Sequence, residues 1–101
     1  WARAGGWLET ERAEYMLAKC HLAAGDARGA IAHAQRCLAI CESNDADAFE
    51  RFFAQGVLAL ACRASGDAAK FGQAKAAALA HHASLGTEQK PWCESTVRLL
   101  E

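Results

Sequence analysis

The sequence has little proline, and none of its cysteines form a Cys-x-x-Cys pair. A single proline, Pro91, excludes collagen-like and proline-rich chains and leaves the rest of the chain free to form long helices. Five cysteines, an odd number without close pairs, favour reduced thiols over a disulfide framework. We therefore expect a cytoplasmic protein. The cysteines are Cys20, Cys37, Cys41, Cys62 and Cys93.

An excess of charge of one sign is also lacking. Eleven Lys and Arg stand against twelve Asp and Glu, which leaves a formal net charge of -1. This balance offers no basic patch for a phosphate backbone or an anionic lipid surface, so neither nucleic acid nor a membrane is expected as a partner. No apolar run approaches the roughly 20 residues of a membrane-spanning helix. With 52% hydrophobic residues, the 101-residue chain is expected to form one compact domain over residues 1–101.

Helix punctuation is regular along the chain. Alanine, the best helix former, makes up about a quarter of the residues. Gly25-Asp26 and Gly66-Asp67, about 41 residues apart, each place a helix-ending glycine beside an aspartate able to cap the next helix. Two helix hairpins are predicted, at about 8–43 and about 47–84, followed by a short helix at about 91–101 that begins at Pro91. The expected fold is all-α, with about five helices and no sheet.

Apolar spacing predicts which helix faces are buried. On the first helix, expected at residues 8–24, apolar residues recur every three or four positions and predict a core-facing stripe of Ala13, Met16, Leu17, Cys20 and Ala24. Asp47 and Glu50 have the spacing of a capping box, and the helix that follows them carries the densest apolar pattern of the chain. This third helix is expected to be the most buried.

The two hairpins resemble the tetratricopeptide repeat. The first matches it at Leu17-Ala18, Gly25-Asp26, Ala30-Ile31 and Cys37-Leu38, and the second at Leu58-Ala59, Gly66-Asp67 and Ala78-Leu79. The spacing of about 41 exceeds the usual 34 or so and is similar to the longer variant found in kinesin light chains. Over about residues 4–80 the chain is also similar to small bacterial proteins of this type that have no assigned function. The resemblance implies that the hairpins stack as a right-handed array.

The resemblance further implies a concave surface lined by the first helix of each hairpin. The side chains expected on it are Arg12, Tyr15, Lys19, Phe53 and Arg63. Such a basic and aromatic set suits an extended or helical peptide that bears a carboxylate. The alternative is a solvated face whose basic residues pair with Glu9, Glu11 and Glu14. Our leading hypothesis is a protein-interaction or assembly scaffold that has no cofactor and no catalytic activity.

A second hypothesis concerns metal binding or thiol redox chemistry. His33, Cys37 and Cys41 are spaced by four, so they share one side of a helix, and an imidazole with two thiolates suits a soft metal ion. The alternative is that both cysteines are small buried apolar side chains. No nucleophile elbow or phosphate-binding glycine loop accompanies them, so an enzyme is not expected.

Two stacked hairpins leave apolar faces that a neighbour must cover. One candidate is an upstream segment, because the sequence begins at Trp1 rather than Met and we expect it to start inside a longer product. Another is the short last helix, with Trp92 and Val97. The third, which we favour, is a second copy of the chain that packs through Trp1 and Trp7 to form a homodimer.

Overall fold

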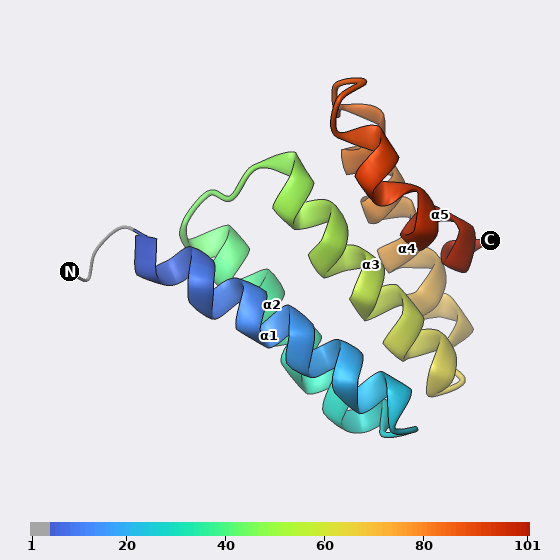
Figure 1. Ribbon diagram of the computed structural model, residues 1–101. Helices are drawn as coiled ribbons and strands as arrows, with labels where there is room; N and C mark the ends of the chain where they lie inside the picture. Colours follow the sequence, from blue (N-terminus) through green and yellow to red (C-terminus); the bar gives the residue numbers. More distant parts are fainter. Residues whose placement is uncertain (1–4) are drawn as a thin grey trace.

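The computed structural model describes residues 5–101, which are almost entirely helical (Figure 1). The helices are α1 (Gly5–Ala23), α2 (Ala27–Ser43), α3 (Ala48–Ala64), α4 (Ala68–Ala83) and α5 (Glu94–Leu100), with the short 3-10 helix η1 (Lys90–Cys93) ahead of α5. No residue from 5 to 101 lies in a strand, so the predicted all-α class is confirmed. In this same range, no helix combines the length and the apolar character needed to cross a bilayer.

The two predicted glycine-aspartate corners reverse the chain. Gly25 and Gly66 have positive φ angles of 80° and 86°, which are favourable for glycine and strained for other residues. Asp26 and Asp67 then each accept a hydrogen bond at 3.0 Å from the backbone N–H three residues on. Each corner therefore ends one helix and caps the next, which makes α1 and α2 one antiparallel hairpin and α3 and α4 another.

The helix ends differ slightly from the predicted ones. Asp47 caps α3 by accepting the Glu50 N–H at 3.0 Å, but the Glu50 side chain turns to Arg12, so only one half of the capping box forms. The last predicted helix is divided into η1, with Pro91 in its first turn, and α5. Pro91 therefore starts a helical segment as predicted, although that first segment is a 3-10 turn.

The hairpins pack side by side, with α3 in the centre. α2 packs against α3, α1 also reaches α3, and α5 folds back onto α3 (Figure 1). The contact between α3 and α5 is close at Gly56, where a Cβ atom would lie 3.0 Å from Thr96 Cγ2. As a result α1, α3 and α5 lie on one side of the molecule, while α2 and α4 lie behind them.

The core consists of three clusters that all include residues of α3. Phe52 and Ala59 pack with Leu100 and the alanines of α4, Ala54 packs with Cys37 and Cys41, and Val57 packs with Ala18 and Ala34. The prediction that the third helix is the most buried is confirmed, because α3 has more buried residues than any other helix of residues 5–101.

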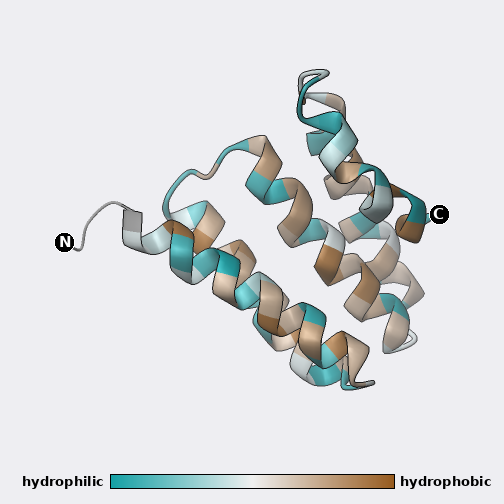
Figure 2. Cartoon of the chain, viewed as in Figure 1, coloured by the Kyte–Doolittle hydropathy of each residue, from teal (hydrophilic) through white to brown (hydrophobic). Residues whose placement is uncertain are grey.

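The predicted apolar stripe of α1 is wrong. Its members are all exposed, with 55% of Met16 and 43% of Leu17 open to solvent. The packed side of α1 carries Glu11 and Ala18 instead. Apolar residues are distributed around α1 rather than confined to one side (Figure 2), so spacing alone could not locate its packed face. We call the exposed set the outer stripe: Ala13, Met16, Leu17, Cys20 and Ala24.

The segments predicted to cover the apolar faces of the two hairpins do so only in part. Val97 packs against the core, so α5 does cover part of α3, whereas Trp92 is 76% exposed. Trp7 packs against the core cluster that contains Cys37 and Cys41. Trp1 lies outside the described residues. The homodimer therefore stays a prediction.

Candidate functional site

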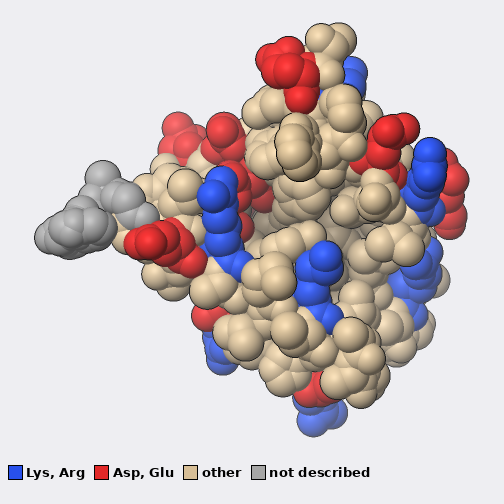
Figure 3. Space-filling view, in the orientation of Figure 1, with Lys and Arg blue, Asp and Glu red and all other residues tan. Residues whose placement is uncertain are grey.

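One face of the molecule carries a groove lined by α1, α3 and the C-terminal segment. It consists of two adjoining cavities of about 390 and about 240 Å³ that share Tyr15. The centre of this face is hollowed and formed mostly by uncharged atoms (Figure 3). We call it the concave groove and define it by six of its lining residues: Tyr15, Met16, Lys19, Phe53, Trp92 and Leu99.

Exposed apolar side chains gather around the concave groove. Among the described residues, four large apolar side chains are exposed, and three of them line it: Met16, Trp92 and Leu99. Below them, the Tyr15 ring meets the Phe53 ring edge to face at 5.8 Å, and Phe53 in turn meets Phe49 at 5.1 Å. The groove thus has an aromatic base and an apolar rim, a composition typical of binding sites rather than of ordinary surface.

Four of the five predicted groove residues do line these cavities, and Arg63 does not. Arg12, Tyr15, Lys19 and Phe53 border one or both. The Arg63 guanidinium lies over the Phe71 ring at 5.1 Å and donates a hydrogen bond of 2.8 Å to the Leu99 carbonyl oxygen. Arg63 therefore ties α5 to the second hairpin instead of facing a ligand.

Arg12 already forms an ion pair with another residue of the same chain. Its Nη2 donates to Glu50 Oε2 at 2.6 Å, and its Nε donates to the other carboxylate oxygen at 3.4 Å. Burial alone would raise the pKa of Glu50, but hydrogen bonds led by that of Arg12 outweigh it and lower that pKa. The partner of Arg12 is thus none of the acidic residues considered from the sequence. Lys19, whose Nζ lies 5.6 Å from the centre of the Tyr15 ring, is the cation left on the groove.

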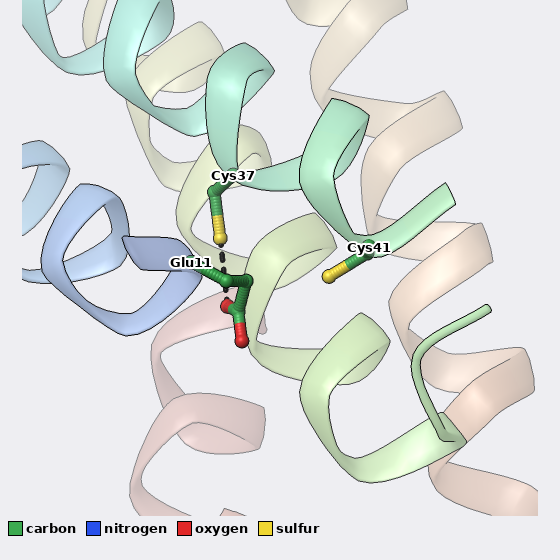
Figure 4. A group of neighbouring side chains, drawn as sticks. All are labelled: Glu11, Cys37 and Cys41. Carbon is green, nitrogen blue, oxygen red and sulfur yellow. Dashed lines mark hydrogen bonds between the residues drawn. The ribbon is translucent and has the colours of Figure 1, made fainter. Parts of the chain in front are cut away.

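A second group of polar side chains lies inside the first hairpin. Glu11 of α1 meets Cys37 and Cys41 of α2, and one ligand-capable atom from each lies within 4.8 Å of the other two (Figure 4). The Cys37 thiol donates a hydrogen bond of 2.9 Å to Glu11 Oε2. Glu11 is only 1% exposed, and neither cysteine is exposed at all. We call these three residues the buried cluster.

The environment of the buried cluster shifts its protonation. Burial, with a smaller contribution from the neighbouring Glu50, raises the pKa of Glu11 to about 7. The adjacent Cys41 thiol, burial and the Glu11 carboxylate together raise the pKa of Cys37. Cys37 is thus held as a protonated thiol, which is a weak nucleophile, and it lies out of reach of a dissolved substrate. The neighbouring Cys37 thiol lowers the pKa of Cys41, but Cys41 is fully buried as well, so neither thiol is open to a dissolved substrate.

The predicted metal set is only partly assembled, because His33 does not join the two cysteines. Its Nδ1 lies 2.6 Å from Glu14 Oε1, and its ring stacks on His21 with centroids 4.9 Å apart. Glu11 takes the place that the sequence analysis gave to His33. The role of Glu11 in this cluster could have been predicted only by knowing which face of α1 is packed, because Glu11 lies on that face with Ala18.

No model of a known protein family matches the chain, and no curated protein or solved structure matches it. The resemblance to tetratricopeptide repeats therefore remains a prediction. The concave groove and the buried cluster are features of the described residues from which a function can be argued.

Proposed function

We propose that this chain is a protein-interaction module that holds a peptide segment of a partner in the concave groove and catalyses no reaction. The observation that carries the proposal is the gathering of Met16, Trp92 and Leu99, all more than half exposed, around adjoining cavities. Large exposed apolar side chains are usually scattered over a protein surface, whereas binding sites bring several of them together around a concave pocket.

The groove also indicates the chemistry of the partner. Its aromatic base, Tyr15 and Phe53, would receive apolar side chains, which supply most of the free energy in such interfaces. Because Arg12 is already paired with Glu50, Lys19 is the groove residue that would meet a carboxylate. The best-fitting partner is therefore an apolar peptide segment with an acidic residue near Lys19, rather than a strongly acidic peptide.

Selection from a random peptide library displayed on phage tests this proposal. Peptides selected on the wild-type chain should be rich in apolar residues. They should bind Met16→Asp and Trp92→Ala at least about tenfold more weakly, because both changes remove apolar surface at the groove. Both side chains are more than half exposed, so the fold should survive, which circular dichroism would verify.

Leu17→Asp is the matched control. Leu17 is next to Met16 and 43% exposed, but unlike Met16 it lines neither cavity of the groove. Selected peptides should bind this variant as they bind the wild type. A library that yields no specific peptide, or peptides that lose as much affinity with Leu17→Asp as with Met16→Asp, would contradict the assignment of the groove.

A further inference from the structure

The buried cluster has the ligand types and the spacing of a metal site. Cys37 and Cys41 lie four residues apart on α2 and project from one face of it, and Glu11 reaches them from α1 (Figure 4). Zinc binds cysteine sulfur at about 2.3 Å and carboxylate oxygen at about 2.1 Å, which sets the ligand atoms of a tetrahedral site roughly 3.5–4 Å apart. Ligand atoms within 4.8 Å of one another need only small side-chain movements to reach that arrangement.

One oxygen of Glu11 is left without a partner. Cys37 satisfies Oε2, but Oε1 is fully buried and has no hydrogen-bond partner among residues 5–101. Buried side-chain oxygens nearly always have a partner, so an orphan in this position requires an explanation. A cation bound by this carboxylate would compensate its negative charge and could take the unpartnered oxygen as a ligand.

From these two observations we propose that Glu11, Cys37 and Cys41 bind a divalent transition metal ion, with zinc as the best fit. Two thiolates and one carboxylate form a donor set that zinc accepts, whereas magnesium and calcium prefer oxygen ligands alone. The fourth position falls to a water molecule, because Arg12 already holds both oxygens of the Glu50 carboxylate. The site joins α1 to α2, so its role is structural. This inference does not depend on the concave groove.

Binding can be written as a balanced exchange of protons. Zn²⁺ enters, Cys37 and Cys41 each lose the thiol proton to solvent, and two S–Zn bonds and one O–Zn bond form. A third proton leaves from Glu11 in those molecules that hold one. No electron is transferred, so no oxidant or reductant is needed. A bound metal ion deprotonates its thiol ligands outright, which overcomes the raised pKa that Cys37 has without the ion.

A competing explanation involves no metal. A protonated Glu11 that shares its proton with Glu50 would also be stable in this environment. The two explanations differ in what they predict for added metal. A metal site binds one ion per chain and releases at least two protons, whereas a carboxyl pair binds none.

Titration of the reduced, chelator-treated 101-residue chain with Zn²⁺ distinguishes them. Calorimetry in two buffers of different ionisation enthalpy should give one ion per chain and two to three protons released. Co²⁺ in place of zinc should develop the thiolate-to-cobalt absorption and visible bands of a tetrahedral site. A saturating excess of zinc should raise the melting temperature by on the order of 10 °C, since the ion binds only the folded chain.

Variants identify the ligands. Cys37→Ser and Cys41→Ser should each lower zinc affinity by more than about 100-fold, because even residues that only orient metal ligands change it by about 10–100-fold. Glu11→Gln should lower it by at least about tenfold. Glutamine keeps the shape of Glu11 and an acceptor for Cys37, so this variant should melt no lower than the wild type without zinc. It therefore tests the site even where a serine variant fails to fold.

Two controls match these variants. Cys62→Ser removes a buried thiol of α3 outside the buried cluster, and His33→Gln removes the imidazole that the sequence analysis placed in the site. Both should bind zinc as the wild type does. The proposal is overturned if the wild type binds less than one ion per chain, if Glu11→Gln binds zinc unchanged, or if either control loses as much affinity as Cys37→Ser.

Discussion

Glu11 and Arg12 are neighbours in the sequence, but packing places their charged groups in opposite environments. Glu11 points into the first hairpin, where burial raises its pKa to about 7. Arg12 has a side chain that is 59% exposed and reaches over to Glu50, whose side chain is 11% exposed. The free energy of unfolding should therefore depend on the ion pair between Arg12 and the nearly buried Glu50 carboxylate.

Arg12→Met tests this dependence. Methionine keeps the apolar stem of Arg12 but leaves the Glu50 carboxylate without its cation. The free energy of unfolding in urea with a chelator present should fall by about 1–2 kcal/mol, between the values for exposed and fully buried ion pairs. The exposed pair of Arg98 and Glu94, 3.9 Å apart, supplies the control, and Arg98→Met should change stability by less than about 0.5 kcal/mol.

A double variant separates the ion pair from other effects of the substitution. Adding Glu50→Gln to Arg12→Met removes the unpaired carboxylate and should recover part of the lost stability. If Arg12→Met and Arg98→Met were equally stable, Arg12 would be an ordinary surface residue, free to meet a ligand as the sequence analysis first supposed.

Only part of the buried cluster could be predicted from the sequence. Cys37 and Cys41 were recognised as a pair because their spacing of four lies within one helix. Glu11 was not, because it comes from another helix and only the packing of α1 on α2 brings it there. His33 has the same spacing as the cysteines, but Glu14 of α1 lies close enough to hold it elsewhere.

Among the elements, the helix corners follow most directly from local chemistry. Gly66 adopts a left-handed conformation with φ of 86°, and Asp67 caps α4 immediately after it. Gly72, inside α4, has no such role. It is exposed, and a Cβ atom there would meet nothing within 4 Å. The two glycines of this hairpin should therefore respond to the same substitution with opposite signs.

Gly66→Ala should lower the free energy of unfolding by about 1–2 kcal/mol, because alanine is strained at a positive φ angle. Gly72→Ala should raise it by about 0.5–1 kcal/mol, since alanine replaces glycine inside a helix without a clash. Thermal and urea denaturation measure both, and each variant is the control for the other. A loss of stability in Gly72→Ala would mean that α4 needs a small residue there for packing.

The outer stripe of α1 shows that helical spacing of apolar residues does not always identify the buried face of a helix. Met16 and Leu17 recur with the other apolar residues at helical spacing, and both are exposed, while the packed side of α1 holds Glu11. Hydrophobic periodicity finds a buried face only where the faces differ clearly in polarity. On α1, apolar residues lie on both sides, so the side that is buried depends on how α1 packs against α2 and α3.

For the whole molecule, α3 links every cluster of the core. The same helix packs with α1 and α2 through Val57 and Ala54, and with α4 and α5 through Phe52. Leu100 is fully buried in the last of these clusters, although it lies at the end of a seven-residue helix. A loss of packing at Leu100 should therefore be felt in both hairpins.

Leu100→Ala should lower the free energy of unfolding by about 2–4 kcal/mol, the usual cost of removing a buried leucine side chain. The shift should appear equally in far-ultraviolet circular dichroism and in the fluorescence of Trp7, which packs in the first hairpin. Replacing Trp1 and Trp92 with phenylalanine leaves Trp7 as the single tryptophan.

Leu99→Ala is the matched control, because Leu99 is 56% exposed and its change should cost about 0.5 kcal/mol or less. A Trp7 transition that did not move in Leu100→Ala would show instead that the two hairpins unfold independently, as the units of some repeat proteins do.

The all-helical class, both corners and the approximate helix limits follow from the sequence, because each depends on residues only a few positions apart. Gly25 with Asp26 and Gly66 with Asp67 each end one helix and cap the next with groups that are neighbours in the sequence. Packing between helices sets which side of α1 is buried, which anion pairs with Arg12 and that Glu11 joins Cys37. These outcomes depend on contacts between helices, where shape and charge far apart in the chain compete, and no local spacing records the result.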